Sequence, residues 1–106
     1  MINVAITDAA PLLASALRRS AIAAGISIDI VQAIERPWAS LTFSGTRHCL
    51  TLTMESGKHA DEWLAAIESA ALLMRGHVAG EPALVARRQL ADLIEATIEV
   101  VTIEDG

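Results

Sequence analysis

The sequence predicts an α+β fold, a two-layer sandwich in which a mainly antiparallel sheet carries two helices packed on one of its faces. Three observations predict it. Two stretches repeat apolar residues at helical spacing, several others alternate apolar and polar residues, and Gly and Pro residues separate them. The expected order is roughly β-α-β-β-β-α-β-β. With 106 residues, the chain is expected to form a single domain, residues 1–106.

The first two expected elements are a short strand and a helix. Residues 2–6 alternate at the period of a strand, with an unstructured leader as the alternative. Residues 9–24 are rich in Ala and predict a helix, because Thr7 or Asp8 can cap its start and Gly25 suits its end. The apolar face of this helix consists of Leu13, Leu17 and Ala21.

A strand and a hairpin are expected next. Residues 26–35 alternate again, and Arg36-Pro37 is expected to end this strand because Pro donates no ladder hydrogen bond. The hairpin joins residues 38–44 to residues 47–54. Its two-residue turn is Gly45-Thr46, with Gly at the first position as a type II′ turn requires.

This hairpin register sorts the side chains onto two faces. The apolar face, expected to pack under the helices, consists of Ala39, Leu41, Phe43, Leu50, Leu52 and Met54, with His48 opposite Phe43. The other face carries Ser40, Thr42, Ser44, Cys49, Thr51 and Thr53, with Trp38 at one end and Arg47 at the other. A slip of one residue would exchange the two faces. The hydroxyl face is therefore expected to be solvated, the seam of a dimer, or a platform for a polar ligand.

The second helix and the last strand complete the fold. Residues 58–75 predict a helix capped by Ser56 and ended by Gly76. Residues 82–93 fit either a strand or a helix, whereas residues 97–105 are rich in β-branched side chains and predict a strand. The apolar stripe of the second helix consists of Ala60, Trp63, Leu64, Ile67, Ala71 and Met74.

The composition favours some classes of protein over others. Apolar residues make up 53% of the chain and the mean hydropathy is +0.44, which indicates apolar surface buried in a homodimer. The net charge of −5 argues against binding to nucleic acid, whose phosphates require Lys and Arg. A single Cys precludes an internal disulfide and suits a reducing cytoplasm. Neither a signal peptide nor a membrane span is expected, so the predicted location is cytoplasmic without membrane contact.

The candidate residues for binding a ligand or partner are Trp38, Ser40, Thr42, Arg47, His48 and His77. For a ligand site or an active site, Arg47, His48 and His77 would have to converge on a polar pocket near the 44–48 turn. The alternative for His48 is a structural role at the sheet edge, and for His77 an interaction with free helix carbonyls. Trp38 suits either a partner contact or a position covered by a neighbouring segment.

Motifs for metals, cofactors and catalysis are not found. His48, Cys49, His59 and His77 lack the paired spacing of a zinc site. No phosphate-binding loop or nucleophile elbow occurs, and Cys49 is expected to be inert. His59 and Glu62 are expected to share one face of a solvated helix start. The sequence therefore predicts no catalytic residue, no metal and no cofactor.

Two resemblances bear on the fold. The middle order α-β-β-β-α resembles double-stranded-RNA-binding domains, but the second helix begins with a single Lys58 where those domains carry several basic residues. The pattern W-x-S-x-T-F-x-G-x-R-H from Trp38 to His48, together with Arg75-Gly76-His77 and the ending V-T-I-E-D, resembles a group of small uncharacterised bacterial α+β proteins. This second resemblance covers most of the chain from residue 38 onward. No activity is assigned to that group, so it implies no functional residue.

These observations together predict a small cytoplasmic protein that self-associates and acts as an interaction or accessory module without catalytic activity. A small-ligand binder or enzyme with a polar pocket near the 44–48 turn is the alternative. A nucleic-acid-binding module is the third possibility, from element order only.

Overall fold

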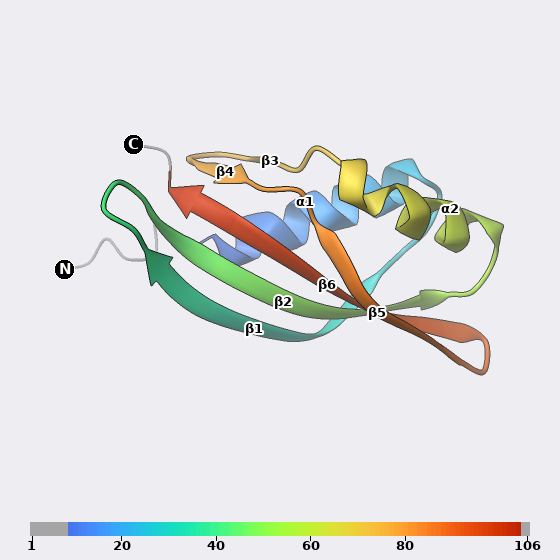
Figure 1. Ribbon diagram of the computed structural model, residues 1–106. Helices are drawn as coiled ribbons and strands as arrows, with labels where there is room; N and C mark the ends of the chain where they lie inside the picture. The colour runs from blue at the N-terminus through green and yellow to red at the C-terminus, as the bar shows by residue number, and fades with distance from the viewer. Residues whose placement is uncertain (1–8, 105–106) are drawn as a thin grey trace.

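The computed structural model of the chain describes residues 9–104, in the α+β class that the sequence predicts (Figure 1). The elements are the helix α1 (Ala10–Ala23), the strands β1 (Asp29–Ala39) and β2 (Ser44–Glu55), the helix α2 (Lys58–Ala66) with a 3-10 turn η2 (Ile67–Ser69), and the strands β3 (Leu73–Met74), β4 (His77–Ala79), β5 (Ala83–Leu90) and β6 (Leu93–Glu104). The expected strand 2–6 and the caps Thr7 and Asp8 lie outside the described residues.

The six strands form one sheet in the order β1-β2-β6-β4-β3, and the strand pairs of the described residues are antiparallel. β5 also pairs with β6, on the same edge as β4 but farther toward the start of β6. Residues 77–90 therefore run along β6 as one strand interrupted at residues 80–82. The Gly80 N–H still donates to the Val101 carbonyl at 2.8 Å, while Pro82 has no N–H to donate.

The helix α1 agrees with the prediction in extent and in its buried face. Leu13 and Leu17 are fully buried because they recur at helical spacing on the side that faces the sheet. The helix ends in a Schellman motif, in which the Gly25 N–H donates to the Ile22 carbonyl and the Ile26 N–H to the Ala21 carbonyl. Gly25 has φ of +86°, which any other residue would adopt only with strain.

The helix α2 is shorter than the predicted 58–75. It ends at Ala66, the 3-10 turn follows, and the chain is extended from Ala70 onward. The apolar stripe holds as far as Ile67, whereas Ala71 is exposed. Gly76, expected to stop the helix, lies instead in the turn between β3 and β4 with φ of +78°. The helix ends early because the extended chain after it buries Leu72 and forms β3, which pairs with β4.

The start of α2 also differs from the prediction. The residue before the helix is Gly57, and no side chain caps the first turn. Ser56 binds a different segment, because its hydroxyl donates to the Asp92 carbonyl at 2.9 Å. The predicted cap is therefore wrong, and Ser56 instead ties the β2–α2 connection to the turn between β5 and β6.

The core is one cluster of buried residues, mainly from α1, α2, β2 and β6. Figure 1 shows α1 and α2 on the same side of the long strands. Buried and more exposed residues alternate along β2 and β6, as expected for strands with one covered face. The Trp63 indole N–H donates to the Ser20 hydroxyl at 3.0 Å and joins the two helices. The buried sheet residues are His48, Leu50, Leu52, Met54, Ile94, Ala96, Ile98, Val100 and Thr102.

The predicted hairpin register is wrong. The turn lies at residues 40–43, so Ala39 pairs with Ser44 and Trp38 with Gly45. Leu41 and Phe43, expected in the core, are 106% and 56% exposed. The turn is held by Ser40, whose N–H donates to the Phe43 carbonyl at 2.7 Å and whose hydroxyl accepts from the Phe43 N–H at 3.1 Å. One half of the predicted apolar face is buried as expected, namely Leu50, Leu52 and Met54. The other half is exposed, namely Ala39, Leu41 and Phe43.

Pro37 does not end a strand. β1 passes through Arg36-Pro37 and continues to Ala39. β1 lies at the edge of the sheet, where the position of a missing N–H can face away from the partner strand. The two strands expected over residues 26–44 are therefore one. The resulting order α-β-β-α differs from the α-β-β-β-α order of double-stranded-RNA-binding domains, so that resemblance is wrong.

The C-terminal part of the chain forms strands. Residues 82–93, which fitted either state, form β5 and the turn that follows it. The predicted last strand is confirmed, and it begins earlier, at Leu93. No helix in residues 9–104 is long and apolar enough to cross a membrane.

Candidate functional site

One face of the sheet carries no helix of residues 9–104, and we call it the open face. Its side chains are those that alternate with the buried ones along β2 and β6. At one end of this face, the strand pairings align one residue from each of β1, β2, β6, β4 and β3 in a row of mainly apolar side chains. The row consists of Trp38, Gly45, Ile103, Val78 and Leu73. Trp38 is half-buried beside Gly45, while Val78 and Leu73 are exposed.

The next positions along the open face form a small hollow of about 230 Å³. Arg36 of β1 and Arg47 of β2 lie directly opposite each other. One step farther along, Ile34 pairs with Cys49, and Cys49 pairs with Glu99 of β6. The same five residues line the hollow, which is therefore built by the three strands β1, β2 and β6.

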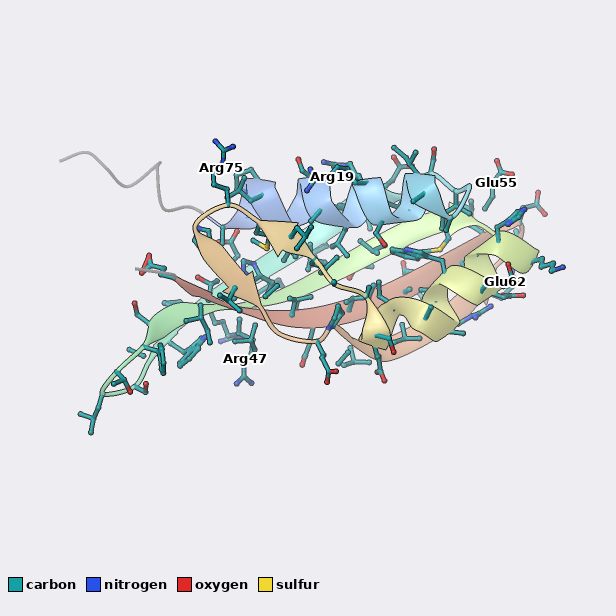
Figure 2. The ribbon with its side chains drawn as sticks, turned by 90° about the horizontal axis from the view of Figure 1, so that it is seen from above. Arg19, Arg47, Glu55, Glu62 and Arg75 are labelled. Carbon is teal, nitrogen blue, oxygen red and sulfur yellow. The ribbon has the colours of Figure 1, made fainter. Side chains whose placement is uncertain are left out.

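The two arginines of the hollow are a like-charge pair. Like charges directly opposite each other on neighbouring strands destabilise the pair. Within residues 9–104, neither guanidinium has a hydrogen bond or an ion pair, although Glu99 lines the same hollow. In Figure 2, Arg47 projects from the molecule far from Arg19 and Arg75. The hollow therefore presents two positive groups whose hydrogen-bond donors are unused by the described chain.

Other arginines of the sheet are paired. Arg87 lies on the helix side of β5 and binds the Asp61 carboxylate of α2. Arg88 lies on the open face and donates to Glu95 at 2.8 Å, its neighbour across β5 and β6. The contrast makes the Arg36 and Arg47 pair unusual among the cations of this sheet.

His48 has a structural position. It is 2% exposed on the helix side of β2, and its Nε2 lies 2.9 Å from the Thr102 hydroxyl oxygen. That hydroxyl also donates to the Thr46 carbonyl at 3.4 Å. Arg47, the next residue in sequence, points to the opposite face. The sheet thus separates Arg47 from His48.

His77 does not approach His48 either. His77 pairs with Glu104, whereas His48 pairs with Val100, and β6 lies between their strands. The register places them about 10 Å apart across the strands and about 13 Å apart along them. His77 is 9% exposed, and its Nδ1 has no hydrogen-bond partner in residues 9–104. The structure therefore does not bring the three expected pocket residues together.

The remaining candidates lie in the hairpin. Ser40 and Thr42 are exposed in the turn, and Ser44 points to the helix side, where its hydroxyl donates to Glu104 at 3.0 Å. The hydroxyl face is therefore smaller than expected. Its described members on the open face are Thr51, Thr53, Cys49, Trp38 and Arg47. The Trp38 indole nitrogen is buried without a partner in the described chain.

Two further hollows lie outside the open face. One of about 340 Å³ is lined by residues 25–27 and 55–60, next to the start of α2. The other, of about 550 Å³, lies between α1 and the β3–β4 hairpin, where Arg19 donates to the Leu73 carbonyl at 3.3 Å. His59 and Glu62 share a face of α2, as expected. Both are exposed, and the His59 Nδ1 lies 4.0 Å from the Glu62 Oε1.

Metal ligands do not gather in the described residues, where no group of three or more His, Cys, Asp or Glu side chains could hold an ion. Sequence reasoning identified Arg47 but missed Ile34, Arg36 and Glu99. They lie on other strands, and only the correct register brings them to Arg47.

The chain matches no known protein family, no curated protein and no solved structure. The resemblance to small bacterial proteins stays a prediction.

Proposed function

We propose that this protein is a small self-associating module, a two-layer sandwich of sheet and helices whose strand β1 pairs with β1 of a second copy. The observation that carries the proposal is the exposure of β1. Every residue of this eleven-residue strand except Ile30 and Trp38 is exposed. Within residues 9–104, β1 is an edge strand that pairs with β2 alone. A long, uncovered edge strand is a template for pairing with another chain.

The side chains of β1 are those of a contact surface. Val31 and Ile34 are 57% and 43% exposed, and both are strongly apolar. No residue of β1 is fully buried, and between Ile30 and Trp38 both faces of the strand are exposed. Pairing two β1 strands would bring apolar side chains of the two copies into cross-strand contact and would satisfy the outer backbone groups of both edges.

The edge is suited to a two-fold pairing. A bulge at Val31 interrupts it on one side and Pro37 removes a donor on the other, which leaves residues 32–36 free to pair. The midpoint of this segment, and of the whole strand, is Ile34. Antiparallel pairing about a two-fold axis at Ile34 sets Ile34 against Ile34 of the second copy, the isologous arrangement of a C2 dimer.

The charges disfavour the registers shifted toward the end of β1. Centred on Ile34, the pairing sets Gln32 against Arg36 and Ala33 against Glu35, with no like charges opposed. Centred on Glu35 or on Arg36, it sets that residue against its own copy, which is unfavourable.

The hairpin tip extends the same contact. In this antiparallel pairing, the hairpin tip that carries Leu41 in one copy would run toward the segment before β1 in the other copy, which contains Ser27. Ser27 borders the hollow of about 340 Å³ beside α2. This hollow offers a place for Leu41 and Phe43, whose side chains are otherwise in solvent.

The test measures the mass of the particle in solution by light scattering on a sizing column, over a wide range of concentration. The wild type is expected to be a dimer. Ile34→Lys places two like charges at the two-fold axis and is expected to give a monomer. Thr97→Lys is the matched control, since Thr97 lies on the open face in the central strand β6, away from the edge.

The outcomes separate edge pairing from packing of two open faces. A monomeric wild type at all concentrations rules out self-association. A dimer that survives Ile34→Lys but is lost in Thr97→Lys would place the contact on the open face. Thermal unfolding by circular dichroism confirms that both variants are folded. Leu41→Ser combined with Phe43→Ser should weaken the dimer without lowering the stability of the monomer.

A further inference from the structure

We propose that the hollow between Arg36 and Arg47 binds the anionic group, a carboxylate or a phosphate, of a small molecule. Its wall is complete within one chain, so the inference does not depend on self-association. The hollow is not the polar pocket expected from Arg47, His48 and His77, since the two histidines lie elsewhere.

The first argument is the geometry of the two cations. Arg36 and Arg47 are directly opposed on neighbouring antiparallel strands. Side chains in such a pair start from Cβ atoms about 5 Å apart, so both guanidinium groups can reach one ligand. Guanidinium groups bind carboxylates and phosphates through pairs of parallel hydrogen bonds. An anion between them would convert a repulsive pair into a bridged one.

The second argument is that the donors of both arginines are unused. Within residues 9–104, neither is held by a carboxylate, in contrast to Arg87 and Arg88 in the same sheet. Glu99 also lines the hollow but lies beyond ion-pair distance of both arginines. The hollow therefore carries a net positive charge in a chain whose overall net charge is −5.

The third argument concerns size and the apolar wall. A hollow of about 230 Å³ suits a small acid rather than a polymer or a dinucleotide. Ile34 and Cys49 form one side of it, so the ligand can place a short apolar group there while its anionic group meets the arginines. Glu99 disfavours a second negative charge at the far end. The site therefore fits a small molecule with one anionic end.

Cys49 provides the test, because it is the only Cys of the chain and is half-buried in the hollow itself. The experiment compares the rates at which iodoacetate and iodoacetamide alkylate Cys49 at low ionic strength. Both reagents attack the same thiolate, so the ratio of their rates cancels its abundance and reports the local charge. Each arginine is expected to raise the ratio of the iodoacetate rate to the iodoacetamide rate about threefold, because iodoacetate is an anion. This is the Coulomb effect of a unit charge about 6 Å away in water.

The variants Arg36→Gln and Arg47→Gln should each lower this ratio about threefold, the same Coulomb effect in reverse. Arg18→Gln is the matched control, because Arg18 is an exposed arginine of α1 remote from the hollow. A ratio that is equal in the wild type and in both hollow variants would overturn the inference.

Binding itself is measured by protection. Inorganic phosphate and acetate are added separately, and each is compared with chloride at matched ionic strength. One or both should slow the reaction of Cys49 with iodoacetamide in the wild type and not in Arg47→Gln. Protection by phosphate alone assigns a phosphate group, and protection by acetate alone a carboxylate.

A second measurement of binding does not depend on the reactivity of Cys49. The side-chain Nε–H signals of Arg36 and Arg47 in nitrogen-15 NMR spectra should shift with the protecting anion, while that of Arg18 stays unchanged. If neither anion protects Cys49 nor shifts these signals beyond the chloride control, the hollow is not an anion site.

Discussion

Gly45 tests the sheet register most directly. A Cβ added at this residue would lie 2.0 Å from the Thr102 carbonyl oxygen and 3.1 Å from the Ile103 Cα. Carbon–oxygen contacts between neighbouring strands are normally about 3.3–3.6 Å, so β2 and β6 would have to separate by more than about 1 Å. Backbone atoms cannot turn away as a side chain can. Gly45→Ala should therefore disrupt the pairing at one end of the sheet.

The expected loss can be estimated from two terms. Overpacking a well-packed site costs about 1–3 kcal/mol, and a clash against backbone belongs at the upper end of that range. A lost ladder hydrogen bond adds about 0.5–1.5 kcal/mol. Gly45→Ala should thus lower the free energy of unfolding by about 3.5–4.5 kcal/mol. For a domain of this size, that corresponds to a Tm lower by at least about 12 °C.

Gly80→Ala is the matched control. A Cβ at Gly80 meets the Val101 carbonyl oxygen at 3.5 Å, an ordinary contact. Replacing Gly by Ala where the backbone conformation permits it raises the free energy of unfolding by about 0.4–1 kcal/mol, because it lowers the conformational entropy of the unfolded chain. This variant should therefore be as stable as the wild type or slightly more stable. Urea and thermal unfolding, followed by circular dichroism, compare the two.

The result that would refute the register is a Gly45→Ala variant as stable as Gly80→Ala. Gly45→Asn sharpens the comparison. In the type II′ turn that the sequence suggested, Gly45 would have positive φ and face solvent, where Asn is tolerated. In the strand, Asn meets the same clash as Ala with a larger side chain, and it should be at least as destabilising.

Two further substitutions test local features of the sheet. Ala91, in the turn between β5 and β6, has φ of +54°, so Ala91→Gly should raise the free energy of unfolding by about 0.5–1 kcal/mol; a lower Tm would contradict the strained turn. Thr102→Val removes the hydroxyl that bonds His48 at 2.9 Å and should cost about 1–3 kcal/mol in urea unfolding. Thr102→Ser retains that hydroxyl and is the control. If Thr102→Val were as stable as the wild type, the hydrogen bond to His48 would contribute nothing to stability.

Local patterns predicted the elements that face the core. The spacing of Leu13 and Leu17 identified α1, and the alternation of Leu50 and Leu52 identified the buried face of β2. These predictions succeed because each residue's burial depends on its own element lying over a single core. The antiparallel sheet and the two helices are therefore readable from the sequence.

The strand β5 could not be assigned because its pattern is not that of a half-buried strand. Arg87 points toward the helices, where Asp61 of α2 neutralises it, and Arg88 points to the open face. Charged residues thus stand on both faces. The partner that makes Arg87 acceptable on the helix side is remote in sequence, so no local rule finds it.

The candidate site was predictable only in part for a similar reason. Arg47 was identified because it lies next to unusual residues in the sequence. Arg36 was interpreted as the end of a strand, since Pro37 follows it, and Glu99 lies in a strand that contacts β2 only in the folded sheet. A hollow built by three strands depends on two registers, and an error in one of them hides it.

The hairpin error has a physical cause that bears on the proposed dimer. Leu41 and Phe43 alternate with polar residues, and the rule that apolar residues lie inside placed them in the core. In the single chain they lie in solvent in the turn that follows β1. In a β1-paired dimer they would lie beside the loop that precedes β1 in the second copy. In the proposed dimer, the rule that apolar residues lie inside would therefore hold across two chains, although it fails within one.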